Sequence, residues 1–156
     1  MLEFRGQSER KLMREARDFV RQLVLPTVYP EAIETIRWHQ EQGHVVAIVS
    51  GATKFVVKPL AEALGIRHYL YTRLEVEHGR FTGRVIDPIC FEEGKIYWLQ
   101  QLVDEQTIDL AKSWFYSDSR HDLPLLESVT DPIAVNPDAV LLAHAAERVW
   151  PVIDCH

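Results

Sequence analysis

Hydrophobic residues occur in two alternating patterns along the chain, and each pattern predicts a different kind of secondary-structure element. Apolar residues at helical spacing predict helices over 8–24, 31–42, 53–64, 94–103, 123–128 and 138–146. Short apolar runs rich in β-branched residues predict strands over 45–50, 68–75, 113–117, 132–135 and 149–153. Strands that alternate with helices in this order predict right-handed βαβ units. The sequence therefore predicts an α/β fold with a Rossmann-like parallel sheet and helices on both faces.

Turn and capping residues mark the ends of these elements. Ser8 and Asp138 stand where an oxygen side chain would cap a following helix. Residues 73–85 alternate between polar and apolar on both sides of His78-Gly79, which predicts an antiparallel hairpin.

Composition narrows the class of protein. The 156 residues are enough for one ordinary domain. The net charge of -6 and the scattered basic residues argue against nucleic acid as a partner. Cys90 and Cys155 form no CxxC pair, which is typical of a reducing compartment. No apolar run approaches the ~20 residues of a membrane span, so we expect a soluble cytoplasmic protein with no membrane partner.

Polar residues follow two of the predicted strands, at the edge where parallel sheets bind ligands. Ser50-Gly51 offers a hydroxyl and backbone N–H groups at a helix start, which suits a phosphate oxygen. Asp118 and Asp122 lie four residues apart after a later strand and suit a hard divalent cation with its water.

Two further residues complete the candidate site. Lys95 begins a helix, where an ammonium group can meet phosphate charge, and Asn136 follows the fourth strand. A hydroxyl, an ammonium, two acids and an amide at one sheet edge predict a Mg²⁺-dependent phosphoryl site.

Each of these residues also has a structural interpretation. Ser50 could be a helix cap and Lys95 a solvated charge. Asp118 and Asp122 could be a cap and a first-turn acid, and Asn136 a turn residue. His121 lies inside the acidic loop, where it could contact phosphate or simply face solvent. The order of the residues along correctly spaced elements favours the site.

Four segments resemble motifs of the haloacid dehalogenase (HAD) superfamily, closest to its phosphoserine-phosphatase-like IB branch. They are Val46–Thr53, Gly94-Lys95, Tyr116–Leu126 and Ala134–Asp138. The resemblance implies hydrolysis of a phosphomonoester through an aspartyl-phosphate, with Mg²⁺ as cofactor and a small phosphorylated substrate.

The resemblance also implies roles for single residues. Ser50 would hydrogen-bond the phosphoryl group with help from the Gly51 N–H, and Lys95, the catalytic lysine, would neutralise the phosphate and the aspartyl nucleophile. Asp118 would bind Mg²⁺ directly. Asp122 would support the metal's water shell or Lys95, and Asn136 would touch phosphate or substrate.

The sequence departs from the family at one motif. The family's DxDxT string, whose first Asp is the nucleophile, is absent. The strand that carries it would be the central one, between 45–50 and 113–117. Residues 1–28 then resemble a remnant of the helical cap, and residues 29–156 the core domain. Either the two flanking strands pair directly, or another segment or chain fills the gap, which leaves a homo-oligomer possible.

Three functions remain open at this point. The first is a HAD-type phosphatase, inactive as this chain if the nucleophile is missing. The second is a non-catalytic phosphate- and Mg²⁺-binding or partner-binding remnant, which the absent motif favours. The third, a generic nucleotide-binding domain, is weaker because no GxGxxG or P-loop string follows a strand. A truncated product, an internal translation start and a fragment would all give this sequence.

Overall fold

The computed structural model describes residues 4–156, which form two compact units divided between Lys95 and Ile96. No helix within residues 4–156 combines the length and the apolar character needed to cross a membrane.

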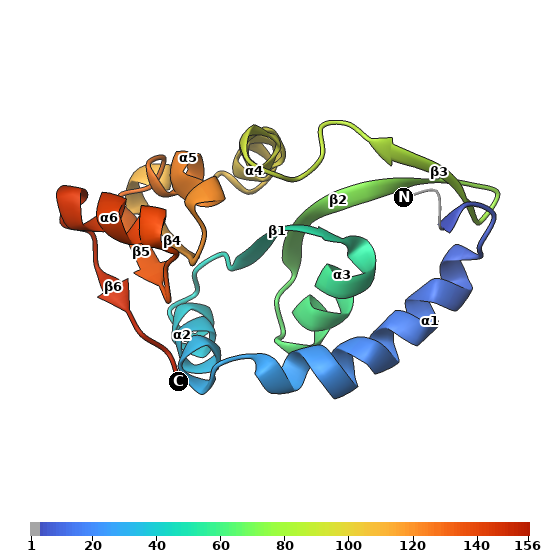
Figure 1. Cartoon of the computed structure of the whole chain (residues 1–156), viewed down its shortest axis with the longest axis horizontal. Helices are drawn as coiled ribbons and strands as arrows, with labels where there is room; N and C mark the ends of the chain where they lie inside the picture. The colour runs from blue at the N-terminus through green and yellow to red at the C-terminus, as the bar shows by residue number, and fades with distance from the viewer. Residues whose placement is uncertain (1–3) are drawn as a thin grey trace. The chain divides into compact units, whose positions relative to one another are not determined.

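The first unit holds a three-stranded mixed sheet in the order β1-β2-β3 (Figure 1). β1 is parallel to β2, and β2 and β3 form an antiparallel hairpin. Its elements are α1 (Glu9–Phe19), a π-helical turn (Val20–Val24), α2 (Pro30–Glu41), β1 (Ala47–Thr53), α3 (Lys54–Ala63), β2 (His68–Glu77) and β3 (Arg80–Ile86). The predicted hairpin at His78-Gly79 is confirmed.

Helix α3 contributes buried apolar side chains to the core of this unit. It contacts β1 and β2 on one side and α1 on the other, so it lies between the sheet and α1 (Figure 1). Phe55, Val57 and Ala61 of α3 are buried, and the Phe55 ring meets that of Phe81 edge-on at 5.3 Å between centroids. Burial of these apolar side chains is the main driving force that holds α3 on the sheet.

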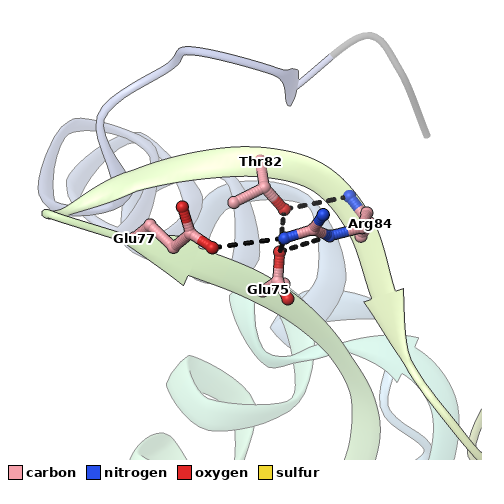
Figure 2. Close-up of polar contacts among 4 residues, drawn as sticks. All are labelled: Glu75, Glu77, Thr82 and Arg84. Atoms are coloured by element: carbon pink, nitrogen blue, oxygen red, sulfur yellow. Dashed lines mark hydrogen bonds and ion pairs between the residues drawn. The ribbon is translucent and has the colours of Figure 1, made fainter.

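A polar network joins the two strands of the hairpin (Figure 2). The Glu75 carboxylate accepts hydrogen bonds from the Thr82 hydroxyl at 2.5 Å and from Arg84 Nε at 2.7 Å. Arg84 also pairs with Glu77 at 3.2 Å. The Thr82 hydrogen bond, followed by that of Arg84, lowers the pKa of Glu75. The network therefore ties the exposed ends of β2 and β3 together while Glu75 is ionised.

The second unit holds a parallel sheet in the order β4-β5-β6. Helices α5 and α6 contact it around a cluster of buried side chains made by Leu126, Ala134, Leu141 and Ala145. The elements are β4 (Trp114–Ser117), a 3₁₀ turn (Arg120–Asp122), α5 (Leu123–Leu126), β5 (Asp131–Val135), α6 (Ala139–Arg148) and β6 (Val152–Ile153). Helix α4 (Glu93–Gln106) spans the division between the units.

The predicted α/β class is confirmed, with parallel pairing in both units. Several elements differ in their bounds from the prediction. The helix predicted over 8–24 ends at Phe19 and continues as the π-helical turn, and β6 covers only Val152–Ile153 of the predicted 149–153, because Val149 ends α6 in a left-handed conformation. β1 runs to Thr53 instead of ending at Ser50, because its register with β2 shifts: Val49 pairs with Leu70, but Thr53 pairs with Thr72. Four residues of β1 thus span the length of two in β2, so Ser50, Gly51 and Ala52 bulge within the strand rather than forming a tight turn.

β1 and β4 are each the first strand of their own sheet, and within residues 4–156 each has one hydrogen-bonded strand neighbour. An edge strand carries backbone groups that can pair with a further strand. The missing central strand, and the division into a cap remnant over 1–28 and a core over 29–156, stay predictions.

Candidate active site

Ser50 and Gly51 lie in the bulge of β1, directly before α3. The Ser50 hydroxyl oxygen accepts a hydrogen bond from the Ala52 N–H at 3.1 Å, and Gly51 is exposed. Ser50 is not the cap of α3, because Thr53 holds that position. The hydroxyl proton of Ser50 is the group that could be offered to a ligand oxygen.

Thr72 on β2 holds this bulge in place, and the sequence did not identify it. Its side chain is only 5% exposed, and its hydroxyl donates to the Gly51 carbonyl at 2.8 Å. The same oxygen accepts from the Cys90 N–H at 3.3 Å. Thr72 therefore connects the end of β1 to the loop that leads into α4. Only the β1–β2 register reveals this, because nothing local in the sequence distinguishes Thr72.

Lys95 lies in the first turn of α4 and is buried, with 8% of its surface exposed. The alternative of a solvated surface charge is therefore wrong, because lysine is almost never buried without an interaction partner. Its backbone is fixed by a hydrogen bond from its N–H to the Glu92 carbonyl at 3.0 Å. The role of its ammonium group in binding phosphate stays a prediction.

Gly94, directly before Lys95, is required by close packing. A Cβ atom at this position would lie 1.8 Å from the Ile89 carbonyl oxygen. The backbone before Lys95 thus passes against the 87–92 loop more closely than any side chain allows.

Asp118 and Asp122 share one turn after β4, as the sequence predicts. Asp118 is exposed, whereas Asp122 is buried and its carboxylate accepts from the Ser117 hydroxyl at 2.8 Å. The Ser117 oxygen in turn accepts from the Ser119 N–H at 3.1 Å. Ser117 is a second residue that sequence reasoning missed, although its place in the Ser-Asp-Ser string is a signal that could have found it.

The interpretation of Asp118 as a helix cap is wrong, whereas Asp122 does lie in the first turn of a short helix, the 3₁₀ turn Arg120–Asp122. Ser119, not Asp118, caps the 3₁₀ turn, since its hydroxyl accepts from the His121 N–H at 3.3 Å. Asp122 precedes α5 but makes no side-chain capping bond. Neither carboxylate therefore makes a side-chain capping bond to the 3₁₀ turn or to α5. His121 is half-buried in the same turn.

The side-chain amide of Asn136 makes hydrogen bonds to the backbone. Its Nδ2 donates to the Cys155 carbonyl at 3.1 Å, and its Oδ1 accepts from the Cys155 N–H at 2.8 Å. Asn136 also adopts a left-handed conformation, with φ of 44°. The amide thus holds the segment after β6 at the carboxyl end of β5, and its predicted contact with phosphate stays a prediction.

The structure groups the predicted residues into two local sets. Ser50 and Gly51 are linked through Thr72 to the loop before Lys95. Asp118 and Asp122 share the acidic turn, with Asn136 at the end of the neighbouring strand. The meeting of the two sets around one anion stays a prediction of the sequence.

The acidic turn suits Mg²⁺ by its chemistry. Magnesium is usually held by one or two carboxylates together with water and substrate phosphate, rather than by a cage of protein ligands. The turn supplies two carboxylates, and among residues 4–156 no group of three or more His, Cys, Asp or Glu is arranged around a metal position. The donor set therefore fits magnesium and not a metal that needs several nitrogen or sulfur ligands.

Parallel strands with polar turns at their carboxyl ends define an α/β protein of the ligand-binding kind. The sequence matches the family of haloacid dehalogenase-like hydrolases over residues 2–127. This chain belongs to that family.

Curated relatives agree with this assignment. A histidinol-phosphatase of Neisseria meningitidis serogroup C (strain 8013) is 36% identical over 94% of this chain and 68% of its own length. A probable phosphatase of Mycobacterium tuberculosis is 40% identical over 84% of this chain and 45% of its own. The chain thus spans 68% of the first relative, and 45% and 55% of others.

Solved structures share the fold. A Bordetella pertussis Tohama I protein of unknown function has a TM-score of 0.88 at 38% identity, covering 95% of this chain and 68% of that one. A substrate-bound phosphoserine phosphatase has a TM-score of 0.63 at 28% identity, covering 78% and 56%.

Proposed function

We propose that this protein provides the phosphate- and Mg²⁺-binding part of a phosphatase that hydrolyses a small phosphorylated metabolite in the cytoplasm. The observation that carries the proposal is the acidic turn, in which Asp118 is exposed and Asp122 is buried against Ser117. Relatives named as phosphatases support the reaction class.

In this proposal the acidic residues bind the metal ion, and the hydrogen-bond donors and the lysine bind the phosphoryl group. Asp118 and Asp122 hold Mg²⁺, which supplies charge stabilisation to the phosphoryl oxygens. The Ser50 hydroxyl and the Gly51 N–H donate to the phosphoryl group, and Lys95 neutralises part of its charge. Thr72 keeps the Ser50-Gly51 bulge in the shape that this binding needs.

A second candidate is a non-catalytic phosphate- and Mg²⁺-binding module. The observation that favours it is the absence of a DxDxT string from the sequence. Loss of a nucleophile that acts with other groups typically costs about 10⁴ to 10⁶ in rate. The binding residues would then remain while turnover is lost.

One experiment separates the two candidates. Hydrolysis of p-nitrophenyl phosphate by this chain is measured with and without Mg²⁺, together with binding of inorganic phosphate by calorimetry. Mg²⁺-dependent turnover that Asp118→Asn abolishes supports the phosphatase. Mg²⁺-dependent phosphate binding without turnover supports the binding module.

The matched control is Asp131→Asn, an exposed acid at the opposite end of the same sheet. We expect this variant to behave as wild type in both assays. Both candidates would be overturned if the chain showed no turnover and no phosphate binding, or if Asp118→Asn and Asp131→Asn reduced these activities equally. Self-association through the open edge of β1 or β4 is a separate proposal that sedimentation equilibrium tests.

A further inference from the structure

Asp138 makes hydrogen bonds in two directions at once. One carboxylate oxygen, Oδ1, accepts from the backbone N–H groups of Val140 and Leu141, at 3.0 and 2.9 Å. These are the usual bonds of an N-cap residue, here for α6. The Asp138 carbonyl also accepts from the Leu142 N–H of α6 at 2.8 Å, whereas the other carboxylate oxygen and the backbone N–H of Asp138 bond outside this helix.

The second set of bonds reaches the acidic turn. Oδ2 of Asp138 accepts from the Arg120 N–H at 2.7 Å, and the Asp138 N–H donates to the Asp118 carbonyl at 2.8 Å. The two hydrogen bonds hold the backbone on either side of Ser119. They therefore fix the two peptide units that directly follow Asp118, the exposed acid of the turn.

We infer that Asp138 is a positioning residue, which sets the backbone conformation of the acidic turn and so the direction of the Asp118 carboxylate. A helix cap needs only one carboxylate oxygen. The second oxygen of Asp138 and its N–H bond instead to the acidic turn, where Arg120 lies 18 residues away in the sequence. Bonds to a charged acceptor are stronger than neutral ones, so the link to Arg120 is a firm restraint. The inference rests on the proposed function for the role of Asp118, but not for the conformation of the turn.

Asp138→Ser separates the two sets of bonds. Serine is a good N-cap, yet its single oxygen cannot cap α6 and also accept from Arg120. Asp138→Ala removes all the bonds of the carboxylate, while the backbone N–H bond to the Asp118 carbonyl is retained in both variants. The control is Asp109→Ser, which alters another aspartate cap in the same unit. Asp109 caps the 3₁₀ turn Leu110–Lys112, where its carboxylate accepts from the Ala111 N–H at 3.0 Å and pairs with Lys112 at 3.7 Å.

The first readout is amide hydrogen exchange in the full chain, monitored by NMR. In Asp138→Ser we expect the Val140 and Leu141 amides to stay protected, while the Arg120 amide exchanges roughly fivefold to tenfold faster. Asp109→Ser should leave all three amides unchanged. Unchanged exchange at Arg120 in Asp138→Ser would overturn the inference, and equal loss at all three amides would show that Asp138 is a helix cap and nothing more.

The second readout is a titration with Mg²⁺ alone, followed through the amide signals of residues 118–122. We expect several-fold weaker binding in Asp138→Ser and wild-type binding in Asp109→Ser. A merely structural cap would leave the Mg²⁺ affinity unchanged when α6 is intact. If the wild-type turn does not respond to Mg²⁺, the metal part of the proposed function is wrong, and the Arg120 exchange still decides the conformational role of Asp138.

Discussion

The Thr72 hydroxyl donates to the Gly51 carbonyl at 2.8 Å while it accepts from the Cys90 N–H at 3.3 Å. One buried side chain on β2 thus joins the bulge of β1 to the loop before α4. Both backbone groups would lose this partner without the hydroxyl, and an unsatisfied buried group is costly.

Thr72→Val keeps the shape of the side chain but removes the hydroxyl. We expect the free energy of unfolding to fall by about 1 to 3 kcal/mol, because the buried Cys90 N–H and the part-buried Gly51 carbonyl lose their partner. Urea denaturation measures the change, and Thr72→Ser should recover most of it. The control Thr35→Val removes a hydroxyl that bonds only within α2. A similar loss in both variants would contradict the special role of Thr72.

Gly94→Ala tests the close contact before Lys95. The new Cβ would lie 1.8 Å from the Ile89 carbonyl oxygen, so the backbone must move. We expect the variant to lose about 3 kcal/mol or more of stability, at the upper end of what overpacking costs. Thermal unfolding measures it.

Gly51→Ala is the matched control, because a Cβ there would lie 3.4 Å from the Cys90 carbonyl oxygen, close to ordinary contact distance. Its change should stay within about 1 kcal/mol. If Gly94→Ala were as stable as Gly51→Ala, the close approach to Ile89 would be wrong.

His39 should make the stability depend on pH. Its ring is 7% exposed and its Nδ1 lies 2.9 Å from that of His44, so burial first, and His44 second, lowers its pKa from 6.5. As the pH falls below 6.5, the unfolded chain binds a proton at this residue more readily than the folded chain does. The free energy of unfolding therefore decreases towards acid, and is fully retained above that pH.

The measurement is urea denaturation of wild type and of His39→Gln at several pH values between about 8 and 5, the range where histidines titrate. We expect a shallower dependence on pH in the variant. Equal slopes in the two proteins would refute this source of acid sensitivity.

Asn136→Ala should release the segment after β6. The substitution removes both side-chain bonds to the Cys155 backbone, so the buried Cys155 thiol should react faster with a thiol reagent. The buried Cys90 thiol is an internal control and should keep its rate. Mass spectrometry after timed labelling distinguishes the two sites, and equal acceleration at both would indicate general unfolding instead.

The sequence by itself determined the order and type of the elements, because helical and strand periods are local properties. It placed Asp138 as the cap of α6, the hairpin at His78-Gly79, and the two acids in one turn after β4. The family motifs fall at the ends of those elements, so membership in the haloacid dehalogenase-like family could also be predicted from the sequence.

Only the tertiary structure decided how the backbone of the site is held. Register between β1 and β2 produced the bulge at Ser50 and brought Thr72 to Gly51. The parallel pairing of β4 with β5 brought Asp138, which follows β5, to Arg120, which follows β4. These contacts join residues 18 to 21 positions apart. Local periodicity carries no information about such pairs, because they depend on how neighbouring strands and helices align in space.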